Sequence, residues 1–297
     1  MAGADGAVEY LLAWDAQGAT LEARYARLRA DPRYPAAART FARAMLEQAE
    51  ADRALESVLK DAGRNVAAKC LAYLHVTGGL TLPRLKALCA ETGLVSPGRA
   101  RTLLIYLQHL GYATALPRRG SKEPTRYEPT ARFLETWHQQ MRATLQSAAV
   151  IEPAALRVLN RLHVPAVFES FVRCISEAYL QGLKGIDPTD PFFRTFMHSY
   201  AGTQIVHGLV TAADDDFPPR DPIAFLPTET AKRFSVSRLH VRRMMDAAQQ
   251  QGLIQLTEGS LAWTSAGRAA VDHIYATQLI VFLITAARTA RTCAELL

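Results

Sequence analysis

The sequence predicts a mainly α-helical protein with small β-wings, in which one helix-turn-helix-plus-wing unit occurs twice. Good helix formers dominate the composition, and two Ser residues each stand fifteen positions before a Gly: Ser96 before Gly111, and Ser237 before Gly252. After each Gly come two short β-prone runs and a Thr, Thr130 or Thr264, that suits the start of another helix. We therefore expect two winged helix-turn-helix units, joined by a helical middle and related by a pseudo-two-fold axis.

Each pair of Ser and Gly predicts the two ends of one helix. A Ser hydroxyl can accept a hydrogen bond from a free backbone N–H of the first turn, and Gly readily takes the positive φ that often follows the last turn. Between these ends, apolar residues recur at helical spacing. The matching positions are Ala100, Leu103, Leu104 and Leu107 in the first helix and Val241, Met244, Met245 and Ala248 in the second.

Length and composition favour a globular protein, and the lack of a catalytic motif favours one that is not an enzyme. The chain has 297 residues, of which 49% are hydrophobic and 21% charged, which suits two or more domains with real cores. The four cysteines and eight histidines show no metal-ligand spacing, and no phosphate-binding loop or nucleophile motif occurs. We expect no metal and no cofactor. The net charge of +6 is compatible with a polyanionic partner.

The chain divides into four predicted regions. These are N-terminal helices over residues 1–64, a first winged-helix unit over 65–150, a helical connector over 151–190, and a second winged-helix unit with a C-terminal helix over 191–297. Within them we expect continuous helices over Ala36–Lys60 and Phe192–Val210, and Thr228 as the cap of a helix reaching Phe234. The apolar run Leu279–Ile284 is too short to span a bilayer and indicates a buried helix.

The face opposite each apolar stripe is basic and is the predicted DNA-reading face. Arg101 and Arg242 occupy the same position in the two helices. Arg is the best bidentate reader of guanine, and the N-terminal residues of a reading helix meet the base edges. The candidate DNA-binding residues are Ser96, Arg99, Arg101, Thr102, Arg118, Arg119, Lys122 and Arg126 in the first unit and Lys232, Arg233, Ser237, Arg238, His240, Arg242 and Arg243 in the second.

Local charge supports this interpretation, but the two predicted wings differ. Residues 96–126 hold six basic residues and one acid, and residues 232–243 hold five basic residues and no acid. A solvated helix face usually mixes signs, although basic winged helices also serve as protein-docking modules. The loop at 117–124 is basic, whereas the second turn offers Glu258 and no base. We therefore expect two heads that are not equivalent.

One aromatic segment is a candidate ligand pocket. Its residues are Phe193, Phe196, Met197, Tyr200 and His207, which are soft or aromatic and lie close together in sequence. Such a stripe can line a pocket between helices, but the same pattern is typical of an ordinary core. Both interpretations stay open from the sequence.

The second unit resembles the MarR-type winged-helix transcriptional regulators. The residues that carry the resemblance run from Thr228 to Gly252-Leu253 and from Leu261 to Gly267-Arg268. The first unit resembles the family more loosely, through Val95–Gly111 and Tyr127–Arg132. The resemblance implies a transcription factor, often with a small aromatic effector. The chain departs from it in carrying two units, extra helices and no basic second wing.

Together these patterns predict a transcriptional regulator whose partner is double-stranded DNA. The two units in one chain make it a monomeric pseudo-dimer or a homodimer. The alternatives are a tandem winged-helix replication initiator and a protein-interaction scaffold. Asp5 and Glu9 stand where a signal peptide would carry basic and then apolar residues, so we expect a cytoplasmic protein with no membrane partner.

Overall fold

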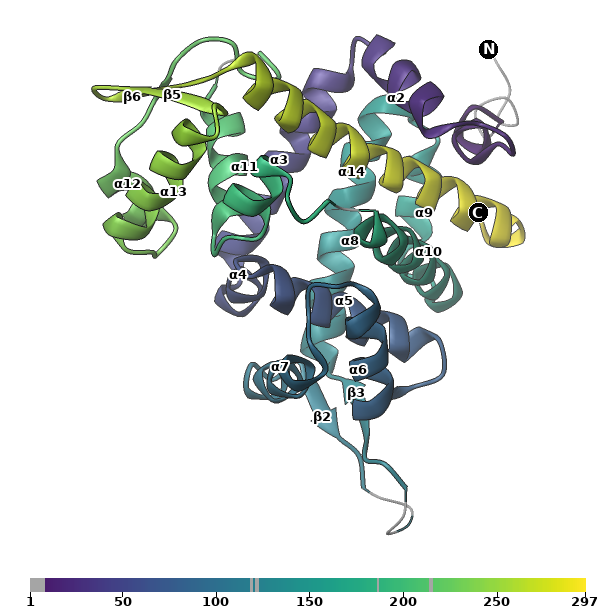
Figure 1. Ribbon diagram of the computed structural model, residues 1–297. Coiled ribbons are helices and arrows are strands. Elements are labelled where there is room, and N and C mark those ends of the chain that lie inside the picture. Colours follow the sequence, from purple (N-terminus) through teal and green to yellow (C-terminus); the bar gives the residue numbers. More distant parts are fainter. Residues whose placement is uncertain (1–8, 118–119, 121–122, 186, 214–215) are drawn as a thin grey trace.

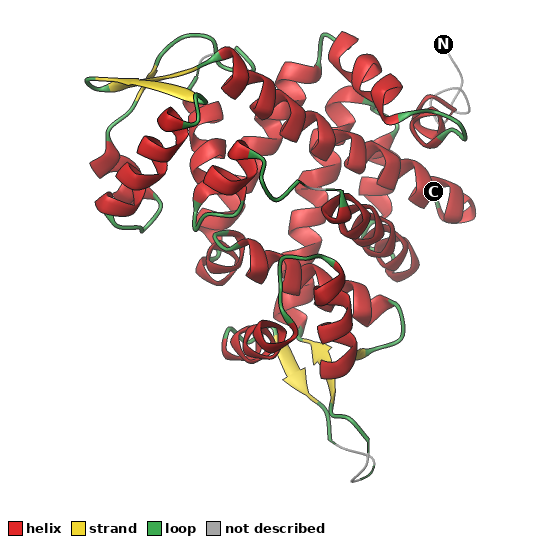
Figure 2. Ribbon diagram, in the orientation of Figure 1, coloured by secondary structure: helices red, strands yellow, loops and turns green. Residues whose placement is uncertain are grey.

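The computed structural model describes residues 9–117, 120, 123–185, 187–213 and 216–297. It is mainly helical and contains two antiparallel three-stranded sheets. Figures 1 and 2 show the two strand hairpins at separate corners of a helical body. The predicted class, mainly α with small β elements, is therefore confirmed.

The N-terminal helices lead into a break that the sequence did not predict. The elements are η1 (Ala13–Asp15), α2 (Leu21–Ala30), α3 (Tyr34–Ala51) and α4 (Arg53–Leu59). The expected single helix over Ala36–Lys60 is wrong, because the backbone turns extended at Asp52. The Asp52 carboxylate then accepts hydrogen bonds from the N–H groups of Ala54 and Leu55 and starts α4 as a new helix.

The first sheet lies within residues 62–151, here called the first β-segment. Its elements are α5 (Ala62–Val76), β1 (Leu80–Thr81), α6 (Leu82–Glu91), α7 (Pro97–His109), β2 (Ala113–Ala115), β3 (Arg126–Pro129) and α8 (Ala131–Ile151). The strand order is β1-β3-β2, with β3 antiparallel to both neighbours. Thr81, Ser96 and Thr130 each cap the helix that follows, as predicted for Ser96 and Thr130.

The second sheet lies within residues 202–292, here called the second β-segment. Before it come α9 (Ala155–Arg161), α10 (Pro165–Lys184) and the short helix η2 (Phe193–Met197). Its elements are α11 (Gly202–Ala212), β4 (Ile223–Ala224), α12 (Pro227–Arg233), α13 (Arg238–Gln250), β5 (Ile254–Thr257), β6 (Ser260–Trp263) and α14 (Ser265–Thr292), and η3 (Ala294–Leu296) follows. The strand order is β4-β6-β5, so the two β-segments share their order of elements and their strand arrangement.

The same backbone contacts close both β-segments. The hydroxyl of Thr130 donates to the carbonyl of Gly111 over 2.6 Å, and that of Thr264 donates to the carbonyl of Gly252 over 2.6 Å. The two glycines have φ values of 71° and 68°, in the left-handed region that favours Gly. Each junction therefore ties the end of one helix to the start of another.

Two local predictions in the second half are wrong. The expected helix over Phe192–Val210 is interrupted, because Ala201 has a φ of 58° and its N–H donates to the carbonyl of Lys60 over 2.7 Å. This contact to another part of the chain replaces the hydrogen bond that would continue a helix. Thr228 is not a cap, because α12 already begins at Pro227, whose fixed φ suits a first turn.

Helices from each half pack against the β-segment of the other half. α3 packs on α8 and also on α11, whereas α10 packs on α14 and also on α5. α8 and α14 touch each other, and in Figure 1 they cross the middle of the molecule. One buried apolar cluster includes Leu28, Leu103, Val158 and Leu279, so it runs through all four predicted regions. The region boundaries stay predictions.

The last long helix is apolar enough to resemble a membrane span. α14 has 28 residues, and an 18-residue window within it has a mean hydropathy of 1.5, with 50% of that window buried. It is thus longer than the apolar run noted in the sequence. α14 packs against α2, α8, α9 and α10, and burial within a protein core accounts for such a composition.

Candidate nucleic-acid interface

α7 has the shape predicted for a reading helix. The Ser96 hydroxyl accepts a hydrogen bond from the N–H of Arg99 over 3.3 Å, and Pro97 occupies the first turn. The opposite side of the helix exposes Gly98, Arg101 and Thr102. This part of the prediction is confirmed as local structure. The predicted apolar stripe is buried, and it consists of Ala100, Leu103, Leu104 and Leu107.

α13 repeats this arrangement with different surface residues. The Ser237 hydroxyl accepts from the N–H of His240 over 3.0 Å. The stripe of Val241, Met244, Met245 and Ala248 is buried. Because successive residues turn by about 100° around a helix axis, Leu239 and Arg243 stand opposite this stripe, with Arg242 beside them. All three are exposed.

The candidate basic residues differ in whether an acid neutralises them. Arg99 forms an ion pair with Asp61 over 3.0 Å, and Arg233 lies 3.4 Å from Glu50. His240 is also engaged, since its Nε2 lies 2.8 Å from the carbonyl oxygen of Tyr200. Among the described residues, no ion pair involves the remaining exposed cations, which are Arg101, Arg126, Lys232, Arg238, Arg242 and Arg243.

The predicted difference between the two hairpins is described by the structure only at the second hairpin and at the base of the first. Arg118, Arg119 and Lys122 lie outside the described residues. Arg126 begins β3, is exposed, and packs its guanidinium beside Gly79. The second hairpin turns through Glu258 and Gly259, and Gly259 has a φ of 77°. The second hairpin is therefore short and carries no base.

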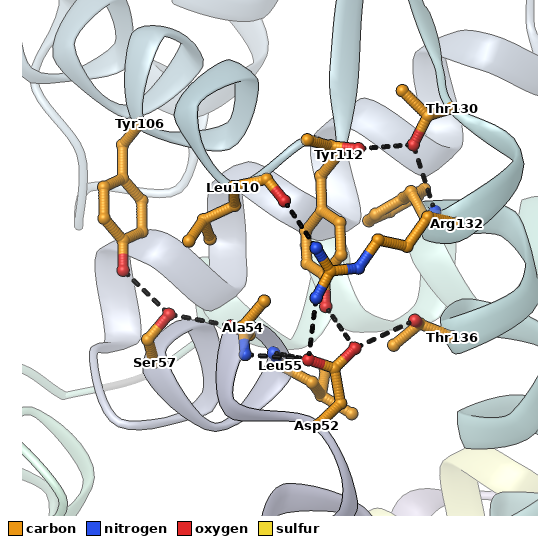
Figure 3. A network of polar contacts seen from close by, with 12 residues as sticks. Asp52, Ala54, Leu55, Ser57, Tyr106, Leu110, Tyr112, Thr130, Arg132 and Thr136 are labelled. Carbon is orange, nitrogen blue, oxygen red and sulfur yellow. Dashed lines mark hydrogen bonds and ion pairs between the residues drawn. The ribbon is translucent and has the colours of Figure 1, made fainter.

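A polar network holds the end of α7 against α4 and α8 (Figure 3). Besides capping α4, the Asp52 carboxylate accepts hydrogen bonds from the hydroxyls of Tyr112 over 3.2 Å and Thr136 over 3.3 Å. Arg132 lies 3.3 Å from the same carboxylate and donates to the carbonyl of Leu110 over 3.2 Å. One acid thus joins α4, Tyr112 in the chain that follows α7, and the first turns of α8.

The ionised form of Asp52 favours this network. Burial alone would raise the pKa of Asp52, but hydrogen bonds from two backbone N–H groups and from Tyr112, with the nearby Arg132, lower it below 3.8. Asp52 is therefore ionised near neutral pH and attracts Arg132.

A second link runs from α7 to α4, because the Tyr106 hydroxyl donates to the Ser57 hydroxyl over 2.7 Å.

A shallow hollow lies beside α7. Its volume is about 400 Å³, and it is lined mainly by apolar residues from α6, α7 and the chain leading into β3. Arg101 and Ile105 stand on its α7 side, and Ile105 is 56% exposed. The hollow is thus next to the predicted reading face rather than at the predicted ligand pocket.

The aromatic residues of the predicted ligand pocket contact different ring partners, although the helices that carry them, η2 and α11, pack together. Phe196 packs against the ring of Trp263 at 5.8 Å, in an aromatic cluster that includes Phe192. His207 bonds through Nδ1 to the Tyr275 hydroxyl over 2.6 Å, in a second buried cluster. Phe193 is buried, Met197 is half-buried, and Tyr200 is exposed. Their arrangement is that of two core clusters and a surface residue.

The described residues contain no group of three or more His, Cys, Asp or Glu side chains that could hold a metal ion. Cys70 and Cys89 are fully buried, and neither forms a disulfide. The basic surfaces of α7 and α13 are therefore the best-defined candidate site in the described part of the chain.

No family model, curated protein or solved structure matches this chain. The site is interpreted from its own residues alone. The sequence patterns did not point to one of them, Leu239, which is 55% exposed on the predicted reading face of α13. The signal that could have found it was its position: it is an apolar residue out of phase with the stripe of Val241 and Met244.

Proposed function

We propose that this protein is a DNA-binding transcriptional regulator whose two β-segments are winged helix-turn-helix units, with α7 and α13 as reading helices. One observation carries the proposal. In both β-segments a Ser-capped helix exposes an Arg at the same position, Arg101 and Arg242, and neither Arg pairs with an acid among the described residues. An unpaired guanidinium on a helix face suits the major-groove edge of guanine.

The packing of the long helices supports a pseudo-dimer. α3 precedes the first β-segment but packs on α11 of the second, and α10 precedes the second β-segment but packs on α5 of the first. Two identical subunits that exchange terminal helices would have this pattern of contacts. A rigid body of this kind would hold two reading helices at a fixed separation, as recognition of two half-sites about 34 Å apart requires.

The proposal predicts specific, salt-dependent binding of duplex DNA. The test is selection from random duplexes at two salt concentrations, followed by affinity measurements on the enriched sequence. Arg101→Ala and Arg242→Ala should each weaken binding by about 1–3 kcal/mol, in different half-sites. The matched control is Arg161→Ala, which removes an exposed Arg from α9. If Arg101→Ala and Arg242→Ala bind the enriched duplex as tightly as Arg161→Ala does, the assignment of α7 and α13 is overturned.

The hollow beside α7 favours a second candidate function, a protein-docking scaffold. Its lining is mainly apolar, and Ile105 is exposed there, so a partner helix could bury these residues. A scaffold would not enrich any duplex, and its weak DNA affinity would not fall with salt as counterion release demands. The same selection experiment therefore separates the two functions.

A small aromatic effector does not form part of the proposal. The residues expected to line its pocket belong to packed aromatic clusters, with Phe196 against Trp263 and His207 against Phe41 and Tyr275. Filled clusters of this kind stabilise the core through their own ring contacts.

A further inference from the structure

We infer that Leu239 is a specificity-determining residue that contacts the 5-methyl group of a thymine in the half-site read by α13. This inference rests on the proposed function, because it requires α13 to enter a major groove. It adds a base preference that Arg residues alone do not give. It also assigns a function to an apolar side chain that the core does not use.

The position of Leu239 carries the inference. It lies in the first turn of α13, two residues after the Ser237 cap, and the N-terminal part of a reading helix approaches the base edges most closely. Its side chain is 55% exposed and stands opposite the buried stripe. Leu239 is therefore directed away from the protein, as a base-reading residue must be.

The charges around Leu239 indicate what would cover it. Arg238 precedes it, and Arg242 and Arg243 follow at the three- and four-residue spacings that place side chains on one helix face. None of the three forms an ion pair among the described residues. An apolar contact inside a ring of free cations suits a polyanion with an apolar group. In the major groove of DNA, that group is the thymine methyl.

The first β-segment lacks this feature. The position equivalent to Leu239, two residues after the cap Ser96, is Gly98, which has no side chain, and a β-carbon placed there would meet no atom within 4 Å. A thymine preference due to this contact should therefore appear in one half-site only. That asymmetry gives the test an internal control.

The experiment uses the full chain and the duplex enriched from a random pool. Each thymine is replaced singly by deoxyuridine, which keeps the base pair and removes only the methyl group. One replacement in the α13 half-site should weaken binding by about two- to fourfold, the value of one buried methyl-sized group. Leu239→Ala should bind the parent duplex correspondingly more weakly and should no longer distinguish thymine from deoxyuridine there.

The matched control is Leu226→Ala, which removes a Leu that is 57% exposed but precedes α12 and lies outside α13. This variant should keep the wild-type response to deoxyuridine. Both leucines are exposed, so both variants should retain the wild-type melting temperature. If Leu239→Ala responds like the wild type, or if no replacement has an effect, the inference fails while DNA binding stands. If no duplex is enriched, the proposed function fails first and the inference with it.

Discussion

The two β-segments share a framework and differ on the surface that the framework presents. Both use a Ser cap, a Gly of positive φ and a Thr hydroxyl that closes the unit. On the exposed side, however, α7 offers Gly98 and Arg101 where α13 offers Leu239 and Arg242, and Thr102 takes the place of Arg243. Backbone hydrogen bonds and the buried stripe fix the shape, so the exposed residues are free to diverge. Under the proposed function, α7 and α13 should therefore recognise different bases.

The halves also differ in how the helix after the sheet packs against the unit. The third residue of α8 is Phe133, which is buried against Tyr112 and Trp137. The third residue of α14 is Gly267, where a β-carbon would lie 1.9 Å from the carbonyl oxygen of Leu253. The first half therefore fills this junction with an aromatic ring, whereas the second closes it by backbone contact.

The largest expected effect tests this difference. Gly267→Ala should lower the free energy of unfolding by about 3 kcal/mol, the upper end of the range for overpacking, because backbone must move. Chemical denaturation monitored by circular dichroism measures it. Gly98→Ala is the control: a β-carbon there meets no atom within 4 Å, so Ala in this helix should be neutral or stabilising by up to about 1 kcal/mol. If Gly267→Ala has the same free energy of unfolding as Gly98→Ala, the close approach of Leu253 to Gly267 does not limit the size of the residue at this junction.

The two halves further differ in the basic side chain that lies between their packed helices, which is a His in one half and a Lys in the other. In the second half, His207 of α11 contacts Tyr275 of α14 and Phe41 of α3, and burial lowers the pKa of His207 to about 4. In the first half, Lys69 of α5 is half-buried and its ammonium lies 4.1 Å from the ring of Tyr179 of α10, where desolvation lowers the pKa of Lys69 to about 8. The two cores should thus respond to different ranges of pH.

The second prediction concerns His207. Its folded pKa lies below the unfolded value of 6.5, so the unfolded chain binds more protons in this range and stability rises with pH. The stabilisation is fully present above about 6.5 and is lost as pH falls towards about 4, by about 2–3 kcal/mol. His207→Gln, which cannot titrate, should remove this part of the dependence in unfolding measurements between these pH values. An unchanged slope in the variant would mean that His207 is not the group responsible.

The helix ends were predictable because caps act within a few residues. Ser96, Ser237 and the two closing glycines stand where the sequence placed them, and so do both buried stripes. These features depend on local hydrogen bonding and on helical periodicity. They needed no knowledge of the rest of the fold.

The errors at Asp52 and Thr228 were local, whereas other errors came from contacts between distant parts of the chain. Ala201 breaks the expected helix because its N–H bonds to Lys60, far away in sequence. Arg99 is paired with Asp61, 38 residues earlier, so its charge is less available for contact with DNA than the sequence suggested. The exposure of Leu239 comes from the structure, although the sequence already placed this residue out of phase with the buried stripe. Sequence patterns describe one element at a time, and these interactions join two.

The smallest expected effect compares the capping acids that precede α4 and η2. Asp52 caps α4 and also accepts from Tyr112 and Thr136, whereas the Asp190 carboxylate accepts one hydrogen bond, from the N–H of Phe193 over 2.6 Å. Asp52→Ala should therefore cost about 1–2 kcal/mol, because it removes a cap and leaves hydroxyl groups unpaired. Asp190→Ala should cost about 0.5–1 kcal/mol, as an exposed cap alone does.

Urea unfolding of both variants at pH 7 measures these two costs, and an acid series extends the comparison. Because the pKa of Asp52 is lowered in the folded protein, its stabilisation is present above about pH 4 and is lost as pH falls through the folded value. The difference between wild type and Asp52→Ala should shrink accordingly in acid. Equal costs for the two variants at pH 7 would mean that the network around Asp52 adds nothing to the cap, and that the first half is not held more firmly by polar contacts than the second.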